Sequence, residues 1–436
     1  MEKTWIPLVV ANIFIALTAP LITAYYDYRY FEQWYEIASK YGVGEIYSHS
    51  AKTAYFPLTV YIYLLFHWMG LRLASLLNTG ASPLNPLVVL VDKIPYIVSF
   101  NAIYFILKKR YGYTAGFLWL INVSAYSTLA GFQVDLLVAL LILASMIYME
   151  EARADRSLLL ASLATSVKQI FVFTGLIPFV VLWRKNGFKV ALRKLLIYFV
   201  LPILALSLPF LLRGPVDFIY KSLFFHGYRY PQDLSLWAIP MYVLVFNVQA
   251  LPGFITWGWI IPFIIFMALI TVKLARDPLV ERNILYYYVI MIAGMIVLNK
   301  VGGLNYLTWL SPLLIAFASR TPGNLSVKLK GISIALPLWS LVLYPFFTFF
   351  SATVVGGDIY IVEDSSWEPA EGIFYASYGY HNPLVGLISA LKSNPTSYFI
   401  FKSLYNAIPA TSIAMTLIYS LTIIYVISIA WRLTRY

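Results

Sequence analysis

The sequence predicts an all-α polytopic membrane protein, and its composition and charge pattern carry that prediction. Of 436 residues, 61% are hydrophobic and only 11% are charged, whereas soluble domains carry about 25% charged residues. The apolar residues form runs that approach the roughly 20 residues a helix needs to cross a bilayer. The net charge of +12 would suit a nucleic-acid-binding protein, but the basic residues form short clusters between apolar runs. Such clusters are typical of signals that orient membrane helices.

Two further features of the composition narrow the chemistry. The chain contains no cysteine, which excludes disulfides, thiolate metal ligands and cysteine nucleophiles. Near the start, Lys3 is followed by a long apolar run without a clear small-residue cleavage site. We therefore expect a retained first span rather than a signal peptide.

The apolar runs predict about twelve spanning helices, some of them short. They lie near residues 5–25, 84–107, 112–131, 134–149, 157–167, 169–183, 194–212, 253–272, 283–298, 304–319, 330–351 and 410–431. Basic clusters separate several of these runs. If all of the clusters face the cytoplasm, both termini do too. The chain is then a multi-pass protein of the cell membrane or the endoplasmic reticulum.

This topology depends on two segments. The run 56–76 must not cross the membrane, because a crossing would reverse every later loop and put the cluster 108–110 outside. We therefore expect 26–83 to form one external loop with two helices lying on the membrane surface. The run 157–183 has basic residues at both ends, which predicts two short helices with an external turn at Val167-Lys168-Gln169.

The start of the first external loop has the pattern of an amphipathic helix. Asp27 stands where the first span ends, and Tyr30, Phe31, Trp34 and Ile37 follow at helical spacing. On the opposite face we expect the polar residues Arg29, Glu32, Gln33 and Glu36. A carboxylate held at the bilayer surface by such a helix suggests a functional site, although a solvated aspartate at a span end is the simpler alternative.

Several polar segments fall on the same predicted external face. They are Asp27 with its helix, 131–135, 167–169, 299–306, and the loop 213–252 with Arg213, His226, Tyr228, Arg229 and Asp233. Each residue alone has a simple explanation; Lys168, for example, could extend to the interface and Asp135 could end a helix. Together they predict a common cavity, because polar groups at membrane depth are costly unless paired or hydrated.

These segments resemble the GT-C superfamily of polyprenyl-phosphate-sugar-dependent glycosyltransferases. Asp27-Tyr28 with Glu32-Gln33-Trp34 looks like the family's first-loop motif, and 54–61 resembles its Tyr-Pro-Pro-Leu-Thr-x-Tyr segment. The stretch 131–135 is similar to the family's Gly-x-Gln-x-Asp pattern. Lys168-Gln169 matches the Lys-Gln of the dolichyl-phosphate-glucose glucosyltransferases of N-glycan assembly, whereas 305–312 resembles a Tyr-x-x-Trp-x-x-Pro segment of mannosyltransferases.

The sequence also departs from that family pattern. Phe56 replaces the first proline of the Pro-Pro pair, and Phe132 follows Gly131 directly, where the glucosyltransferases carry histidine after glycine. Glucosyltransferase-like and mannosyltransferase-like features are mixed, so the transferred hexose stays open between mannose and glucose. The resemblance covers residues 20–315, which divides the chain into a catalytic module, 1–320 with loop 26–83, and C-terminal helices, 321–436 with loop 352–408.

The resemblance implies an inverting transfer from a lipid phosphate to a glycolipid or lipid-linked oligosaccharide on the external or lumenal face. Asp27 is the expected general base. The residues expected to bind the donor phosphate or sugar are Lys168, Gln169, Arg229, Lys300, Gln133 and Asp135. The residues expected to bind or position the acceptor are Trp34, Tyr55, His226, Asn305 and Tyr306. We expect no cofactor and no metal, because only Asp27 and the distant Asp135 would supply carboxylates and divalent cations favour several oxygen ligands.

A polytopic secondary transporter or a lipid-linked-sugar flippase remains the alternative. A transporter typically has internal repeats and ionisable residues near the middle of its spans. The sequence has no visible repeat, and Asp92 and Lys93 adjoin a proline, which would suit a span end. These observations favour the enzyme.

Overall fold

A computed structural model describes residues 5–21, 25–50, 53–80, 82–83, 85–224, 231–243, 253–348, 352–355, 358–361 and 393–434. This part of the chain is helical except for connecting segments and two short sheets. In the first, β1 (Gln232–Asp233) pairs in parallel with β2 (Val301–Gly302). In the second, β3 (Ala352–Val355) pairs antiparallel with β4 (Asp358–Ile361).

The helices follow the apolar runs of the sequence. The α-helices are α1 (Ile6–Thr18), α2 (Tyr25–Tyr41), α3 (Ile46–His49), α4 (Pro57–Leu76), α5 (Pro86–Tyr111), α6 (Tyr113–Leu120), α7 (Val123–Ala130), α8 (Asp135–Glu150), α9 (Ala154–Val167), α10 (Leu176–Asn186), α11 (Phe188–Leu195), α12 (Leu201–Arg213), α13 (Pro215–Ile219), α15 (Ile239–Val243), α16 (Gly253–Gly258), α17 (Ile260–Arg276), α18 (Ile284–Leu298), α19 (Leu307–Arg320), α20 (Gly323–Thr348) and α23 (Pro395–Leu433). Short 3₁₀ turns are η1 (Val43–Glu45), η2 (Gln169–Gly175), η5 (Leu236–Ala238) and η7 (Leu304–Tyr306), and π-helical turns are η3 (Leu196–Val200) and η4 (Tyr220–Phe224).

Three helical segments of the described chain are long and apolar enough to cross a membrane. They are Pro86–Tyr111, Phe188–Arg213, which joins α11 to α12, and Ala410–Leu433 within α23. Shorter apolar helices are Ile6–Thr18, Ile284–Leu298 and Leu307–Arg320. The helical class of the protein agrees with the sequence, and its apolar helices are those of a membrane protein; the number of twelve spans stays a prediction.

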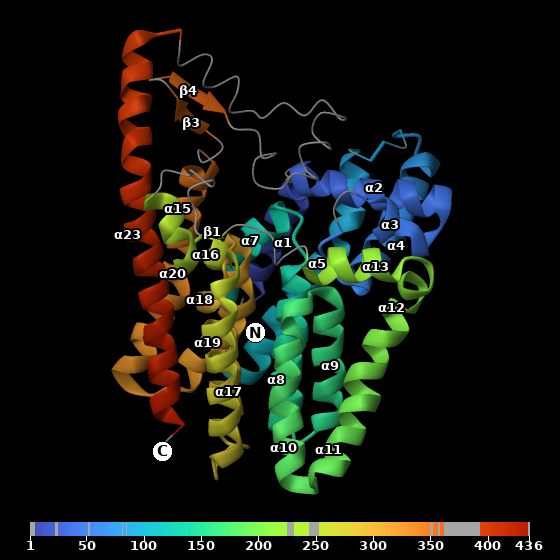
Figure 1. The fold of residues 1–436 in the computed structure, drawn as a ribbon, viewed down its shortest axis with the longest axis vertical. Helices are drawn as coiled ribbons and strands as arrows, with labels where there is room; N and C mark the ends of the chain where they lie inside the picture. Colours follow the sequence, from blue (N-terminus) through green and yellow to red (C-terminus); the bar gives the residue numbers. More distant parts are fainter. Residues whose placement is uncertain are drawn as a thin grey trace.

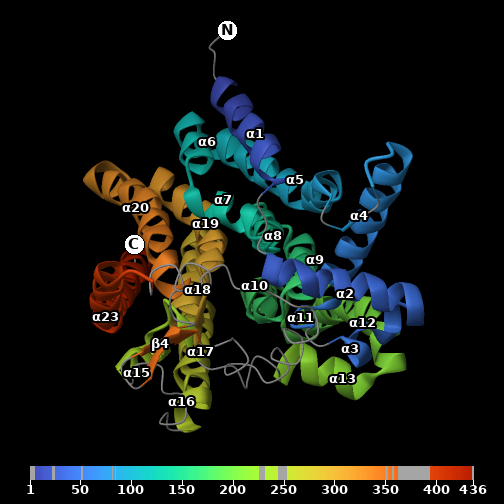
Figure 2. The ribbon, with the colours of Figure 1, turned by 90° about the horizontal axis from the view of Figure 1, so that it is seen from above.

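The helices form an upright bundle with a layer across one end. In Figure 1, α8, α9, α10 and α17 run along the long axis, and α2 lies near the upper end. Figure 2 views the molecule from that end and shows α2 and α4 lying across the bundle, while α8 and α9 point along the line of sight. That α2 and α4 lie on the membrane surface, as expected for loop 26–83, stays a prediction.

An ion-pair network lies at the lower end of the bundle. The turn between α10 and α11 and the C-terminus lie at the lower end in Figure 1. At the same end of α8, Glu150 accepts hydrogen bonds from Arg320 (Nη2 to Oε2, 2.7 Å) and Arg110 (Nη1 to Oε2, 3.3 Å). Asp135 begins α8 at the other end, so Asp135 and this ion-pair network are separated by the length of the helix.

One predicted span differs from the structure. The run 112–131 is not one helix but α6 and α7, because the Asn122 side chain accepts hydrogen bonds from the backbone N–H groups of Ser124 and Ala125 and so begins a new helix. The predicted span 410–431 agrees with the apolar segment Ala410–Leu433, and most of the predicted loop 352–408 lies outside the described residues. The last helix is α23, which begins at Pro395, because Asn394 caps it and proline suits the first helical position.

Candidate functional site

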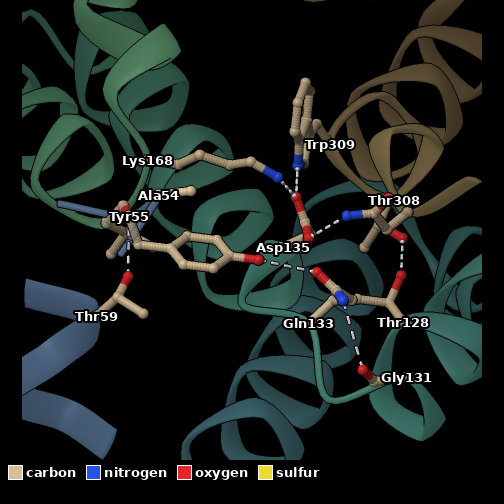
Figure 3. Close-up of polar contacts among 12 residues, drawn as sticks. Ala54, Tyr55, Thr59, Thr128, Gly131, Gln133, Asp135, Lys168, Thr308 and Trp309 are labelled. Atoms are coloured by element: carbon tan, nitrogen blue, oxygen red, sulfur yellow. Dashed lines mark hydrogen bonds and ion pairs between the residues drawn. The ribbon is translucent and has the colours of Figure 1, made fainter. Parts of the chain in front are cut away.

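The beginning of α8, the end of α9 and the beginning of α19 bring polar side chains together at one end of the bundle (Figure 3). The turn predicted at 167–169 is present: α9 ends at Val167, Lys168 is extended with φ −145° and ψ 114°, and η2 follows. The segments 131–135, 167–169 and 305–309 therefore meet, as the sequence predicts.

Asp135 is the centre of this cluster and is completely buried. Its Oδ1 accepts hydrogen bonds from Lys168 Nζ at 2.8 Å and from Trp309 Nε1 at 2.5 Å. Its Oδ2 accepts a hydrogen bond from Asn305 Nδ2 at 2.5 Å. A carboxylate in the first turn of a helix also interacts favourably with the helix dipole. These contacts compensate the cost of burying the charge.

The Lys168 ammonium group lies between this carboxylate and aromatic rings. It is 4.6 Å from the centroid of Tyr306 and 4.8 Å from that of Trp309, and these two rings stack at 4.1 Å. Such distances are those of cation–π contacts. An ammonium group has three N–H donors, and among the described residues Asp135 is the acceptor for one of them. Lys168 can therefore still donate to a ligand oxygen.

A second side of the cluster comes from the segment before α4. The Tyr55 hydroxyl donates to Gln133 Oε1 at 3.2 Å, and Gln169 Nε2 donates to the carbonyl oxygen of Ala54 at 3.2 Å. Within the described part of the chain, Gln169 Oε1 is buried and accepts no hydrogen bond. The Lys168 ammonium group is 6.0 Å from the Tyr55 ring. Hydrogen-bonding side chains and aromatic faces thus surround one lysine.

Helix α2 packs onto this cluster through the apolar face predicted for it. Tyr30, Phe31, Trp34 and Ile37 are buried, which confirms that face. The rings of Phe31 and Trp34 lie 5.7 Å and 6.2 Å from the ring of Tyr55. Asp27 is in the first turn of α2, one helical turn before Phe31, and its side chain lies outside the described residues.

Of the three remaining predicted site residues, the structure describes Lys300. Arg229 and His226 lie outside the described residues. Lys300 is buried, and its ammonium group lies 5.6 Å from the ring of Trp257. The sequence indicates Trp309 only as part of the segment 305–312 that resembles mannosyltransferases. The structure makes it a direct hydrogen-bond donor to Asp135.

Glu32 differs from its predicted position on the solvated face of α2. It is only partly exposed, and its Oε1 is buried without a hydrogen-bond partner among the described residues. Burial raises the pKa of the Glu32 carboxyl to about 7, and the nearby Glu36 acts in the same direction, whereas His67 opposes the shift. The prediction was wrong because α2 also packs on α4, which covers a second face of the helix.

The sequence also missed a buried network beside α2. Asp92 and His67 are 2% and 1% exposed, and the Asp92 Oδ2 to His67 Nδ1 distance is 2.9 Å. The Tyr28 hydroxyl donates to the same Oδ2 at 2.6 Å. Asp92 and Lys93 lie in the interior of α5, not at its end. The signal in the sequence was Asp92, an ionisable residue within an apolar run. Because Pro95 is close by, a span end was the simpler interpretation.

Neither a metal-binding cluster among the described residues nor a similar known protein indicates the chemistry of this site. Among the described residues, no group of three or more histidine or acidic side chains is arranged to hold a metal ion. No family model and no curated protein matches this chain.

Proposed function

We propose that this protein is a membrane glycosyltransferase of the GT-C type. It would move a hexose, mannose or glucose, from a polyprenyl or dolichyl phosphate to a glycolipid or lipid-linked oligosaccharide. The observation that carries the proposal is the Lys168–Asp135 pair, held among Tyr306, Trp309 and Tyr55 at the end of the bundle covered by α2.

The donor phosphate is the natural ligand for Lys168. Fixed positive charge stabilises a phosphate leaving group, and it acts most strongly where water is excluded. Asp135 already accepts three hydrogen bonds, so its role is to hold the lysine, the Trp309 indole and the Asn305 amide in place rather than to accept a proton. The aromatic rings offer faces on which a sugar can stack.

The sugar-binding groups follow from the hydrogen-bonding pattern around Tyr55. Gln133 and Gln169 present amide groups, and the Gln169 Oε1 atom is a buried acceptor without a donor among the described residues. A sugar hydroxyl is a donor that would satisfy it. Trp34, one turn from Phe31 on α2, supports Tyr55 from the other side.

The chemical step is a single displacement at the anomeric carbon. The acceptor hydroxyl oxygen forms the new glycosidic bond while the bond to the phosphate oxygen breaks, and its electron pair leaves with the lipid phosphate. The hydroxyl proton passes to the Asp27 carboxylate. A weak nucleophile such as a sugar hydroxyl benefits from a positioned base.

The decisive assay offers the purified protein two donors, polyprenyl-phosphate-mannose and polyprenyl-phosphate-glucose, together with glycolipid acceptors. Mass spectrometry should detect an acceptor heavier by one hexose with one of the donors. Donor binding without any transfer, in the presence of a range of acceptors, would contradict the proposal.

One observation favours the alternative of a transporter or lipid-linked-sugar flippase. Asp92 and Lys93 are buried in the interior of α5, where transporters carry ionisable residues. However, Lys93 Nζ donates to the carbonyl oxygens of Ala19 at 2.9 Å and Ala130 at 3.3 Å, which ties three segments together and supports a structural role. Movement of a fluorescent lipid-linked sugar across proteoliposome membranes would favour the alternative.

A further inference from the structure

Phe132 has an unusual backbone for a bulky residue. Its φ is +56°, in the left-handed region that glycine adopts readily and that aromatic residues rarely occupy. It lies in the turn between α7 and α8, next to Gln133 and three residues before Asp135. Its side chain is completely buried. Strain of this kind persists only where the surroundings enforce it, and it is frequent at functional sites.

Four aromatic rings from three helices enforce the position of Phe132. Its ring meets those of Tyr28 at 5.0 Å, Phe31 at 5.2 Å, Tyr63 at 6.1 Å and Tyr96 at 5.6 Å, always edge to face. Edge-to-face contacts at these distances are favourable. The rings come from α2, α4 and α5, and we call this group the Phe132 cage. Through it, the turn that carries Gln133 and Asp135 contacts α2 directly.

The cage is anchored by the buried Asp92–His67 pair. Asp92 Oδ2 accepts the hydrogen bond of the Tyr28 hydroxyl at 2.6 Å, and the Pro83 carbonyl oxygen lies 3.0 Å from the same hydroxyl. His67 Nδ1 lies 2.9 Å from Asp92 Oδ2 and 3.1 Å from the Tyr63 hydroxyl. Two rings of the cage are therefore fixed by one hydrogen-bond network, and Tyr28 is the residue directly after Asp27.

We propose that Phe132, together with the Asp92–His67 pair that fixes Tyr28, positions helix α2 and hence Asp27 against the turn that carries Gln133 and Asp135. This inference rests on the proposed function. Asp27 and Asp135 are distant in sequence and belong to separate elements. A transferase must therefore hold the two elements in a fixed position relative to each other. Plain packing would not require a phenylalanine in a conformation that glycine adopts at no cost.

Paired variants at Phe132 and Tyr28 test this role. Phe132→Gly keeps the turn geometry but removes the ring, and Tyr28→Phe removes only the hydroxyl that reaches Asp92. We expect both to lower kcat by about 10-fold or more, because small misplacements of catalytic groups have effects of that size. The KM for the donor should stay close to that of the wild type. Phe132→Tyr, which keeps the ring, should restore kcat.

Tyr288→Phe is the matched control for loss of a buried hydroxyl. The Tyr288 hydroxyl bonds with Ser145 and Ser157, away from the cage. This variant should keep kcat. Unfolding temperatures measured in parallel identify any variant that fails to fold, in which case Phe132→Leu and Asp92→Asn replace it.

A readout independent of activity separates the inference from the proposed function. Amide hydrogen exchange in 25–41 should accelerate in Phe132→Gly and Tyr28→Phe, but not in Tyr288→Phe. Unchanged exchange in α2 would overturn the inference, and so would faster exchange with unchanged kcat. If the wild type transfers no sugar, the proposed function fails, and the exchange data alone decide whether the cage holds α2 in place.

Discussion

The Lys168 ammonium nitrogen lies 2.8 Å from the Asp135 Oδ1 atom, and this buried ion pair joins the end of α9 to the start of the neighbouring α8. The pair has a structural consequence and a functional one. Removing either partner of a buried ion pair leaves an uncompensated charge. Under the proposed function the remaining donors of the lysine bind the donor phosphate, so the two roles need separate tests.

Stability is the first test. Lys168→Ala leaves the Asp135 carboxylate buried with only its two neutral donors, Trp309 and Asn305. We expect a loss of about 3–5 kcal/mol in the free energy of unfolding. Adding Asp135→Asn removes the stranded charge and should recover a large part of that loss. Denaturation of the purified variants in detergent measures both values; equal stability of the single variant and the wild type would contradict the buried pair.

Donor binding is the second test and uses the stabilised background. Lys168→Ala combined with Asp135→Asn should bind a polyprenyl-phosphate sugar more weakly by about 1.5–3 kcal/mol, the usual value of a charge-assisted hydrogen bond. The single variant Asp135→Asn retains Lys168 and serves as the control. Equal donor affinity in the two proteins would make Lys168 a purely structural partner.

The raised pKa of the Glu32 carboxyl predicts that the free energy of unfolding depends on pH. Its pKa is raised by burial from an ordinary value of 4.5 to about 7. Between these values the folded protein holds a proton that the unfolded chain has released, so the Glu32 contribution to stability falls as pH rises. Charged neighbours that modulate the shift are His67, Glu36, Arg29 and Asp92.

The test compares Glu32→Gln with the wild type at pH 5 and pH 8. Because glutamine stays neutral, the variant should gain in melting temperature relative to the wild type as the pH is raised. Glu281→Gln, an exposed carboxylate outside α2 that does not act on Glu32, provides the control. A difference that does not change with pH would show that the Glu32 carboxyl titrates normally.

The orientation in the membrane can be tested with single cysteines, because the native chain has none. Ser39 is exposed on α2, and Asn186 is exposed at the turn between α10 and α11. Ser39→Cys should react with an impermeant thiol reagent added from outside, and Asn186→Cys should react only after permeabilisation. Ser50 lies in the same predicted loop but is only 1% exposed, so a cysteine at this position would be too buried to react. Labelling of position 186 from outside would reverse the predicted topology.

The sequence predicts much of the helix arrangement because apolar runs and their polar ends are local features. The turn at Lys168 followed from the basic residues at both ends of 157–183. The meeting of 131–135, 167–169 and 305–309 then followed from placing all three on one side of the membrane. The break at Asn122 was less visible, since a single capping residue interrupts an otherwise apolar run.

Tertiary packing decided the features that the sequence did not reveal. Asp92 looked like a residue at a span end, and only its partners Tyr28 and His67, from two other helices, make it a buried anchor. Helical periodicity identified one buried face of α2 but not the second contact that covers Glu32. The left-handed conformation of Phe132 has no sequence signal, because glycine and not phenylalanine is the residue expected there.

In the proposed mechanism, the carboxylate of Asp27 accepts the proton of the acceptor hydroxyl. Asp27→Asn keeps the size of the side chain but cannot take a proton. The variant should fold, bind the lipid-phosphate sugar as the wild type does, and transfer it about 10²–10⁴-fold more slowly. Glu36→Gln, an exposed carboxylate on the same helix, should transfer at the wild-type rate.

The most direct measurement is a single-turnover experiment in which enzyme with bound polyprenyl-phosphate sugar is mixed with excess acceptor and the product is followed by mass spectrometry. Slow transfer by Asp27→Asn with unimpaired donor binding is the predicted result. Transfer by Asp27→Asn at the rate of the wild type and of Glu36→Gln would show that Asp27 is not the general base.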